Sequence, residues 1–198
     1  GTSANEFSPN ANTTRGMIVT MLARLEGQNT SGTPWYTAGQ KWAMDNGISD
    51  GTNMTGAITR EQLAAVLYRY AGKVGMDVTA RADLKLFPDA GSVSAYATDA
   101  LSWCVANGIV NGMDDGSFQP NAAITREQMA AILCNYAQYK GIPTESSGDL
   151  SGYSDADRVS AWAEGSVIWA VDMGLIHGMS TDTLDPQGLT TRAQAATV

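Results

Sequence analysis

The stretch Ile-Thr-Arg-Glu-Gln-Met-Ala-Ala-Ile-Leu at residues 124–133 occurs a second time, as Ile-Thr-Arg-Glu-Gln-Leu-Ala-Ala-Val-Leu at residues 58–67. Shorter copies lie near both ends of the chain, as Thr-Arg-Gly at residues 14–16 and Thr-Arg-Ala-Gln-Ala-Ala at residues 191–196. The arginines of the last three copies are spaced 66 residues apart, at Arg60, Arg126 and Arg192. A fixed period of this kind indicates an array of one supersecondary unit.

Each copy of this motif predicts the start of a helix. A Thr followed three residues later by Gln, directly before an apolar run, is a capping box, and it occurs at Thr59, Thr125 and Thr191. After the cap, apolar residues recur at positions i, i+3, i+4 and i+7, which places them on one helix face. These residues are Leu63, Val66, Leu67 and Tyr70 in one copy and Met129, Ile132, Leu133 and Tyr136 in the next.

The arginine of the motif occupies the first helical position, where the helix macrodipole is positive and a cation costs about 0.3–1 kcal/mol. Glu61 and Glu127 can offset this cost, whereas Arg15 and Arg192 have no acidic neighbour. A cation that recurs at this position indicates a site for an external anion, bound by the guanidinium together with free backbone N–H groups. The alternative is an ion pair between the arginine and a carboxylate in a loop.

A further helix is predicted ahead of each motif by two aromatic residues seven positions apart, with a Gly five residues after the second. The pairs are Trp35 and Trp42, Tyr96 and Trp103, and Trp162 and Trp169. Residues at i and i+7 share one helix face, and Gly is a common C-cap. We expect the second aromatic of each pair to lie in the core. For the first, which lies toward a loop, core packing and stacking on a sugar ring both remain open.

Two aspartates and two glycines recur around these helices. Asp89 and Asp155 each follow an aromatic residue by two positions, and we expect each to cap the turn or helix that follows. The alternative is that each accepts a hydrogen bond from a sugar hydroxyl. Gly112 and Gly178 lie in the turn after the aromatic helix, where Gly permits positive φ or close approach of another group to the backbone.

The composition excludes several classes of protein. With 198 residues and 43% hydrophobic residues, the chain can form a packed core. Its net charge of −8 and pI near 4.5 argue against nucleic-acid binding, because no basic stripe could neutralise phosphates. No apolar run approaches the roughly 18 residues of a membrane span. No nucleophile, base or recurring acidic pair forms a catalytic constellation, so we expect no enzyme activity.

The two cysteines and the single His177 nearly exclude a zinc site built from Cys and His, and we expect no metal or cofactor. Cys104 occupies the position of Ala43 and Ala170 in the other copies. We expect both Cys104 and Cys134 to pack as small hydrophobic residues, with a disulfide in an oxidising compartment as the alternative.

The repeats divide the chain into four segments. Residues 1–27 match the second half of a first repeat, and residues 28–72 form a shortened repeat without the aromatic-Asp segment and the Asp-Gly-x-Phe-x-Pro loop. Residues 73–140 form a complete repeat, and residues 141–198 form a repeat clipped in its last helix. The groove of the shortened repeat is therefore a candidate for degeneration.

The complete repeat resembles the S-layer homology module of bacterial surface proteins. The resemblance rests on Phe-Pro-Asp (87–89), Asn-Gly-Ile-Val-Asn-Gly (107–112), Asp-Gly-Ser-Phe-Gln-Pro (115–120) and Ile-Thr-Arg-Glu-Gln (124–128). It implies an all-α fold of tandem helix-loop-helix repeats in a pseudo-threefold body, with the motif helices in a central three-helix bundle. It also implies a secreted, non-catalytic module on the bacterial cell surface, within a larger protein of the cell wall or S-layer.

The resemblance further implies that the module binds a secondary cell-wall polysaccharide, often one with pyruvate ketals on N-acetylmannosamine, in grooves between neighbouring repeats. The carboxylate of the ketal would meet the motif arginine. The binding residues implied in this way are Arg15, Arg60, Arg126, Arg192, Asp89, Asp155, Trp162, Gly112 and Gly178. Arg60 and Arg126 match the family motif best, since Gly16 and Ala193 replace the glutamate in the outer copies. The alternative function is a protein-interaction scaffold with degenerate glycan grooves.

Overall fold

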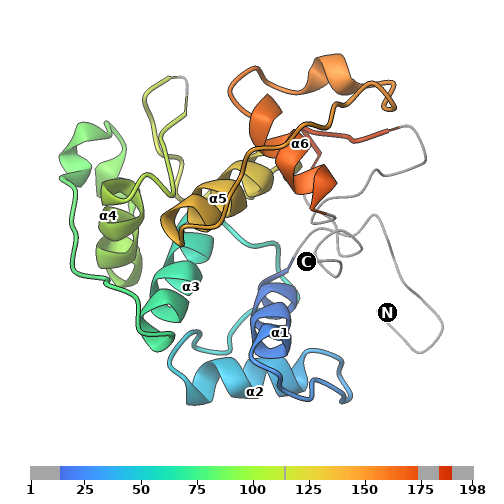
Figure 1. Ribbon diagram of the computed structural model, residues 1–198. Coiled ribbons are helices and arrows are strands. Elements are labelled where there is room, and N and C mark those ends of the chain that lie inside the picture. Colours follow the sequence, from blue (N-terminus) through green and yellow to red (C-terminus); the bar gives the residue numbers. More distant parts are fainter. Residues whose placement is uncertain (1–13, 114, 174–182, 189–198) are drawn as a thin grey trace.

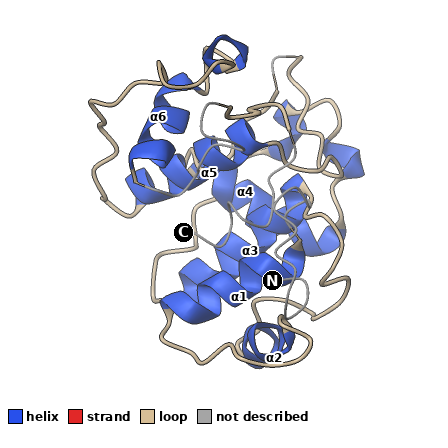
Figure 2. Cartoon of the chain, turned by 90° about the vertical axis from the view of Figure 1, so that its right-hand side faces the viewer, coloured by secondary structure: helices blue, strands red, loops and turns tan. Residues whose placement is uncertain are grey.

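The computed structural model describes residues 14–113, 115–173 and 183–188 (Figure 1). The α-helices in these ranges are α1 (Arg15–Leu25), α2 (Thr37–Asp45), α3 (Arg60–Lys73), α4 (Thr98–Ala106), α5 (Arg126–Tyr139) and α6 (Glu164–Asp172). Short 3-10 helices are η1 (Leu84–Leu86), η2 (Ala90–Ser92), η3 (Ala95–Ala97) and η4 (Ala156–Arg158). The described residues contain helices and loops but no β-strand (Figure 2), which confirms the predicted all-α class.

The helices pack in consecutive pairs. The contacts between helices join α1 to α2, α3 to α4 and α5 to α6, so each motif helix packs against the aromatic helix that follows it in the chain. In the view of Figure 1, α1, α3 and α5 lie toward the middle of the molecule and α2, α4 and α6 toward its outside. The closest helix pairs therefore cross the predicted repeat boundaries. Those boundaries and the pseudo-threefold bundle stay predictions.

The predicted capping boxes at Thr59 and Thr125 are confirmed. Gln62 N donates to Thr59 Oγ1 at 3.4 Å, and Thr59 N donates to Gln62 Oε1 at 3.1 Å. The same two bonds join Thr125 and Gln128, each at 3.4 Å. Each box satisfies two backbone N–H donors at the helix start, which fixes where α3 and α5 begin. The third box, at Thr191, lies outside the described residues.

The second aromatic of each pair lies in the core, as predicted: Trp42, Trp103 and Trp169 are all buried. The first aromatics are more accessible, since Tyr96 and Trp162 keep 49% and 48% of their surface exposed. Burial of a large aromatic side chain removes about 150–250 Å² from water, so the three buried rings contribute much of the packing of the outer helices.

Both thiols pack as small apolar side chains. Cys104 and Cys134 are buried and free, which confirms the expectation that they pack as small hydrophobic residues. Cys104 belongs to a larger core cluster that runs from α1 to α5, and Cys134 to a smaller one between α5 and α6. Burial raises the pKa of the Cys104 thiol, which keeps it protonated and unreactive.

Consecutive copies of the motif contact each other at the helix starts. Thr14 forms an isolated antiparallel bridge with Ala57, and Thr59 forms one with Ala123. Each bridge joins the residue before one motif helix to the segment that leads into the next. The N-termini of successive motif helices are therefore held against the loops of the following repeat, which is where the predicted site residues lie.

Candidate functional site

The backbone N–H groups at the start of the motif helices donate to oxygens within the chain. In α3, Arg60 N donates to Ala122 O and Glu61 N donates to Pro120 O, both at 3.0 Å. The next N–H, of Gln62, donates to the capping threonine. In α5 the first two N–H groups donate at 2.9 and 3.1 Å to the carbonyl oxygens of Gly188 and Pro186. The prediction that free N–H groups bind an external anion is therefore wrong for α3 and α5, because loop carbonyls already occupy these groups.

The side chain of Arg60 is buried and lies against the loop of the following repeat. Its Nε donates to Phe118 O at 2.8 Å, its Nη2 donates to Asn111 O at 2.9 Å, and the guanidinium lies 4.9 Å from the centre of the Phe118 ring. Within the described ranges, Nη1 has no hydrogen-bond partner and no carboxylate forms an ion pair with Arg60. Burial lowers the pKa of Arg60, and Asp89 partly opposes this shift. The carbonyl groups orient the cation without neutralising its charge.

Arg126 repeats this arrangement one repeat later. It is 2% exposed, and its Nε donates to Leu184 O at 2.5 Å, the position equivalent to Phe118 O. Burial lowers the pKa of Arg126 to about 10, while Asp185, Asp155 and Tyr153 act in the opposite direction. The side chain lies at a small crevice that Val167 also lines. Its predicted neighbour Gly178 lies outside the described residues, as does Arg192.

Arg15 differs from Arg60, because a loop carboxylate pairs with Arg15. Arg15 Nη2 lies 2.7 Å from Asp50 Oδ1, and the guanidinium also donates to Ser49 Oγ and Thr52 Oγ1 at 3.2 Å. Hydrogen bonds from the Thr52 backbone lower the pKa of Asp50 against the effect of burial, and the Thr52 side chain and Arg15 add to the lowering. The loop-carboxylate alternative therefore holds for Arg15, whereas the described part of the chain offers no such partner to Arg60.

The glutamate of the motif binds the start of the next aromatic helix. Glu61 accepts hydrogen bonds from Ser94 N at 2.9 Å, from Ser94 Oγ at 2.7 Å and from the Tyr96 hydroxyl at 2.9 Å. Glu127 accepts from Ser160 N and Oγ at 3.0 and 2.9 Å in the same way. Sequence reasoning missed this role. The signal was available, since a Val-Ser-Ala triplet places Ser 33 residues after the glutamate in both copies.

Asp89 and Asp155 hold loops and do not cap helices. Neither carboxylate makes a capping hydrogen bond to the 3-10 helix that follows it. Instead, the two oxygens of Asp89 accept from Phe118 N and Gln119 N, both at 2.8 Å. The oxygens of Asp155 accept from the two equivalent loop N–H groups at 2.7 Å. The capping prediction is therefore wrong, because the loop about 30 residues onward presents two N–H groups to each carboxylate.

The loop that Asp89 holds adopts a strained backbone conformation at Gln119. Gln119 has a φ of 54°, in the left-handed region that non-glycine residues rarely adopt. The backbone N–H groups of Phe118 and Gln119 both donate to the Asp89 carboxylate, and these two bonds hold Gln119 in the left-handed conformation. Because Phe118 O in turn accepts from Arg60, Asp89 positions the loop that orients the arginine.

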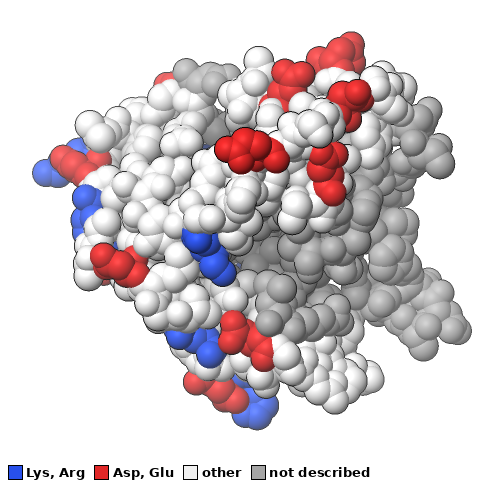
Figure 3. Space-filling model, in the orientation of Figure 1, with Lys and Arg blue, Asp and Glu red and all other residues white. Residues whose placement is uncertain are grey.

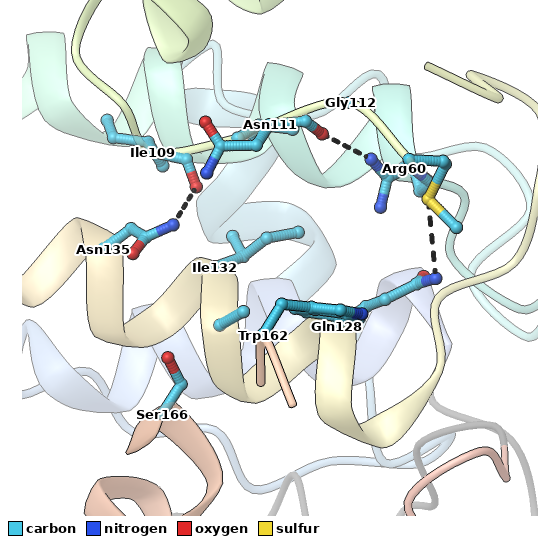
Figure 4. A pocket seen from close by; sticks show the side chains of 12 residues that line it. Arg60, Ile109, Asn111, Gly112, Gln128, Ile132, Asn135, Trp162 and Ser166 are labelled. Carbon is cyan, nitrogen blue, oxygen red and sulfur yellow. Dashed lines mark hydrogen bonds between the residues drawn. The ribbon is translucent and has the colours of Figure 1, made fainter. Parts of the chain in front are cut away.

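A pocket of about 240 Å³ opens beside Arg60. Its walls come from three predicted repeats: Arg60 from α3, the loop at residues 109–113 together with α5, and Trp162 and Ser166 from the next repeat. Figure 4 shows Arg60 and Asn111 on one side of the pocket and Trp162 and Gln128 on the other. Three residues predicted from the sequence, Arg60, Gly112 and Trp162, therefore come together at one site.

The pocket combines an apolar floor with few polar groups. The apolar part is formed by Ile109, Val110, Ala131 and Ile132. Asn135 Nδ2 donates to Ile109 O at 3.2 Å, and Gln128 Nε2 contacts the Met113 sulfur at 3.8 Å. The pocket thus presents a cation, an amide and a half-exposed indole around a concave apolar surface, a combination suited to a small ligand with an apolar face and a negative charge.

Gly112 contributes to the pocket through packing. A Cβ at residue 112 would lie 2.9 Å from the Phe87 ring and 3.2 Å from Ser117 O. Glycine is therefore required so that the loop can pack against Phe87, and positive φ is not the reason. Asp89 and Asp155 do not line the pocket.

Charged side chains are unevenly distributed over the face in Figure 3. Asp and Glu side chains gather where Figure 1 places α6 and the segment before it, and Lys and Arg lie mainly over the other helices. Within the described ranges, no group of three or more Cys, His, Asp or Glu side chains could hold a metal ion. None of the described helices is long and apolar enough to cross a membrane.

Comparison with known proteins identifies a family. The S-layer homology domain matches residues 86–130 and 152–196. An endoglucanase from Bacillus sp. (strain KSM-635) is 33% identical over 146 residues, which is 67% of this chain and 16% of the endoglucanase. The surface-layer 125 kDa protein of Lysinibacillus sphaericus is 35% identical over 107 residues, which is 52% of this chain and 9% of that protein.

Cell surface glycoprotein 1 of Acetivibrio thermocellus is similar over a longer stretch, at 25% identity over 176 residues, or 86% of this chain. That stretch is 8% of the glycoprotein. The chain thus spans less than a fifth of the length of each of these relatives.

Proposed function

The chain contains S-layer homology domains at residues 86–130 and 152–196, and from that premise we propose that it is a non-catalytic module that anchors a larger protein to the bacterial cell wall. The ligand is an anionic secondary cell-wall polysaccharide, with a pyruvylated amino sugar as the recognised unit. The protein is secreted and acts at the cell surface. The shared region is a small part of each glycosidase-like relative, which supports the assignment of this chain to attachment and not to catalysis.

The observation that carries this proposal is the buried Arg60, which has no ion-pair partner among the residues that the structure describes and lies at a pocket that also contains Trp162. Removing a cation from water costs several kcal/mol unless an anion compensates it. Two backbone carbonyls orient the guanidinium, and no atom of the described residues accepts a hydrogen bond from Nη1, whose donors can therefore bind a ligand. A carboxylate bound there would recover part of the electrostatic cost, which makes this position a preorganised receptor for one negative charge.

The size of the pocket favours one sugar residue over an extended segment. Its volume of about 240 Å³ is below the roughly 300–1,000 Å³ of sites for drug-sized ligands. A single ring packed against Trp162 with its carboxylate toward Arg60 fits this space. With a net charge of −8, the protein attracts an anion only through such local cations.

The remaining assignments follow from the same geometry. We assign Arg126 to a second, equivalent site, because its Nε makes the same bond to the next loop. Arg192 and Gly178 are proposed binding residues by their place in the repeat. Asp89 and Asp155 act by holding the loops that orient Arg60 and Arg126.

Calorimetric titration with a pyruvylated cell-wall fragment and its depyruvylated counterpart tests the proposal. We expect binding to the first fragment alone, with the number of sites lowered by one in Arg60→Ala. Arg60→Lys keeps the charge and the fold but not the planar donor pair, so it should weaken binding at the same site. Arg81→Ala, which removes an exposed cation that does not line the pocket, serves as the matched control. Heat with neither fragment would contradict the proposal and favour the protein-interaction scaffold.

A further inference from the structure

The Arg15 position is built from residues equivalent to those around Arg60. Asp50 follows Gly47 by three residues, as Asn111 follows Gly108, and Tyr96 corresponds to Trp162. The structure supports this register, because Arg69 Nη1 donates to Ile48 O at 3.3 Å where Asn135 Nδ2 donates to Ile109 O at 3.2 Å. The Arg15 site therefore has the same framework as the pocket.

Tyr96 is the aromatic residue of the Arg15 site, and the charges of Arg15 and Arg69 both act on its hydroxyl group. Burial and its hydrogen bond to Glu61 raise the pKa of Tyr96 to about 12, and the charges of Arg15 and Arg69 act in the opposite direction. The site thus brings two cations and an aromatic ring together. Like the Arg60 pocket, it combines a motif arginine with an aromatic side chain.

The side chain of Asp50 distinguishes the Arg15 site from the Arg60 pocket. Asn111 offers Arg60 only its backbone oxygen, whereas Asp50 offers Arg15 a carboxylate at 2.7 Å. The side chain of Arg15 is 12% exposed and that of Asp50 is 63% exposed, so the carboxylate covers the guanidinium from the solvent side. A negative charge from the chain itself therefore lies where the ligand carboxylate would bind.

We propose that Asp50 closes the Arg15 site to acidic glycans, so that the array presents unequal sites and Asp50 determines which of them bind. This inference rests on the proposed function. An incoming carboxylate must replace the Asp50 oxygen at Arg15 and is repelled by the same charge. Exposed ion pairs are weak, and repulsion between neighbouring like charges has a similar size, so we expect the affinity of this site to be lowered by up to about tenfold.

The variant Asp50→Asn tests this inference with little change to the loop. Thr52 N and Thr52 Oγ1 both donate to Asp50 Oδ1 at 3.0 Å, and an amide oxygen accepts the same two bonds. Asn is also the residue at the equivalent position 111. Asp45→Asn is the matched control, because it removes one charge from the same repeat at a carboxylate that pairs with Lys41 on α2.

The probe is the pyruvylated cell-wall fragment, titrated calorimetrically into the full chain. We expect Arg15→Ala to leave the wild-type number of sites unchanged, Asp50→Asn to add one site, and Asp50→Asn combined with Arg15→Ala to return to the wild-type number. Asp45→Asn should bind as the wild type does.

The outcomes separate this inference from the proposed function. If the wild type binds through Arg60 but Asp50→Asn adds no site, the closure is refuted and the anchor function stands. The same holds if Arg15→Ala already removes a site from the wild type. If neither the wild type nor Asp50→Asn binds, the proposed function fails and the closure fails with it.

Discussion

Replacing Asp89 with Ala should destabilise the protein by about 2–3 kcal/mol. The carboxylate accepts two backbone N–H groups of one loop at 2.8 Å, those of Phe118 and Gln119. A hydrogen bond to a charged group contributes about 1.5–3 kcal/mol when it is shielded from water and less when it is exposed. The bond from Phe118 N is partly buried and that from Gln119 N is exposed, so we count the first in full and the second in part.

Urea unfolding followed by tryptophan fluorescence measures this loss, because Trp103 and Trp169 are buried in the folded state. The control is Asp99→Ala, which removes the same charge at a side chain that is 80% exposed. A loss below about 0.5 kcal/mol for Asp89→Ala, as is usual for surface substitutions, would refute the reasoning that this carboxylate holds the loop.

The pH dependence provides a second readout for Asp89. Its two N–H bonds lower its pKa although burial acts to raise it. A carboxylate with a lowered folded-state pKa stabilises the protein fully above its unfolded pKa of about 3.9, and this contribution is lost as the pH falls through the folded value. The stability difference between the wild type and Asp89→Ala should therefore shrink below about pH 4, and a difference that grew in acid would contradict the assignment.

Three further substitutions or modifications test other parts of the structure. Glu61→Gln should cost about 2–3 kcal/mol in urea unfolding, because one amide oxygen cannot accept three hydrogen bonds. Gly112→Ala should cost about 1–3 kcal/mol, since its Cβ would lie 2.9 Å from a phenyl ring, whereas Gly91→Ala, with no atom within 4 Å, should be nearly neutral. A thiol reagent should label Cys104 and Cys134 only after unfolding, and rapid labelling of the native protein would contradict their burial.

The helix starts could be predicted because their chemistry is local. A capping box needs only a Thr and a Gln three residues apart, and both boxes in the described part of the chain form as expected. The burial of Trp103 and Trp169 follows in the same way from the period of one helix. The prediction that Arg60, Gly112 and Trp162 are all binding residues came from the family resemblance and not from these local patterns.

The predictions that failed depend on contacts between distant residues. Arg60 N is occupied by the carbonyl of Ala122, and the Asp89 carboxylate is occupied by the N–H of Phe118. Neither partner lies in the same element as the residue concerned, so propensity and spacing within one helix say nothing about them. The repeat period did contain the information, because each of these bonds recurs one repeat later with Arg126 and Asp155.

The recurring motif therefore has a structural role beside the binding role that we propose. Its threonine, its glutamate and its first backbone N–H groups join neighbouring repeats, which explains most of its hydrogen bonds without any ligand. We propose that the outer edge of the arginine side chain serves binding, and that the loop residue beside it, Asn111 or Asp50, decides whether that edge is accessible.

The most direct test of the account is a crystal structure of the protein with the pyruvylated cell-wall fragment. We expect the ketal carboxylate within hydrogen-bond distance of Arg60 Nη1, about 2.7–3.0 Å, and the sugar ring packed against Trp162. The ion pair between Arg15 and Asp50 should stay intact in the same crystal. A fragment bound away from Arg60, or bound at Arg15 with Asp50 displaced, would contradict the account.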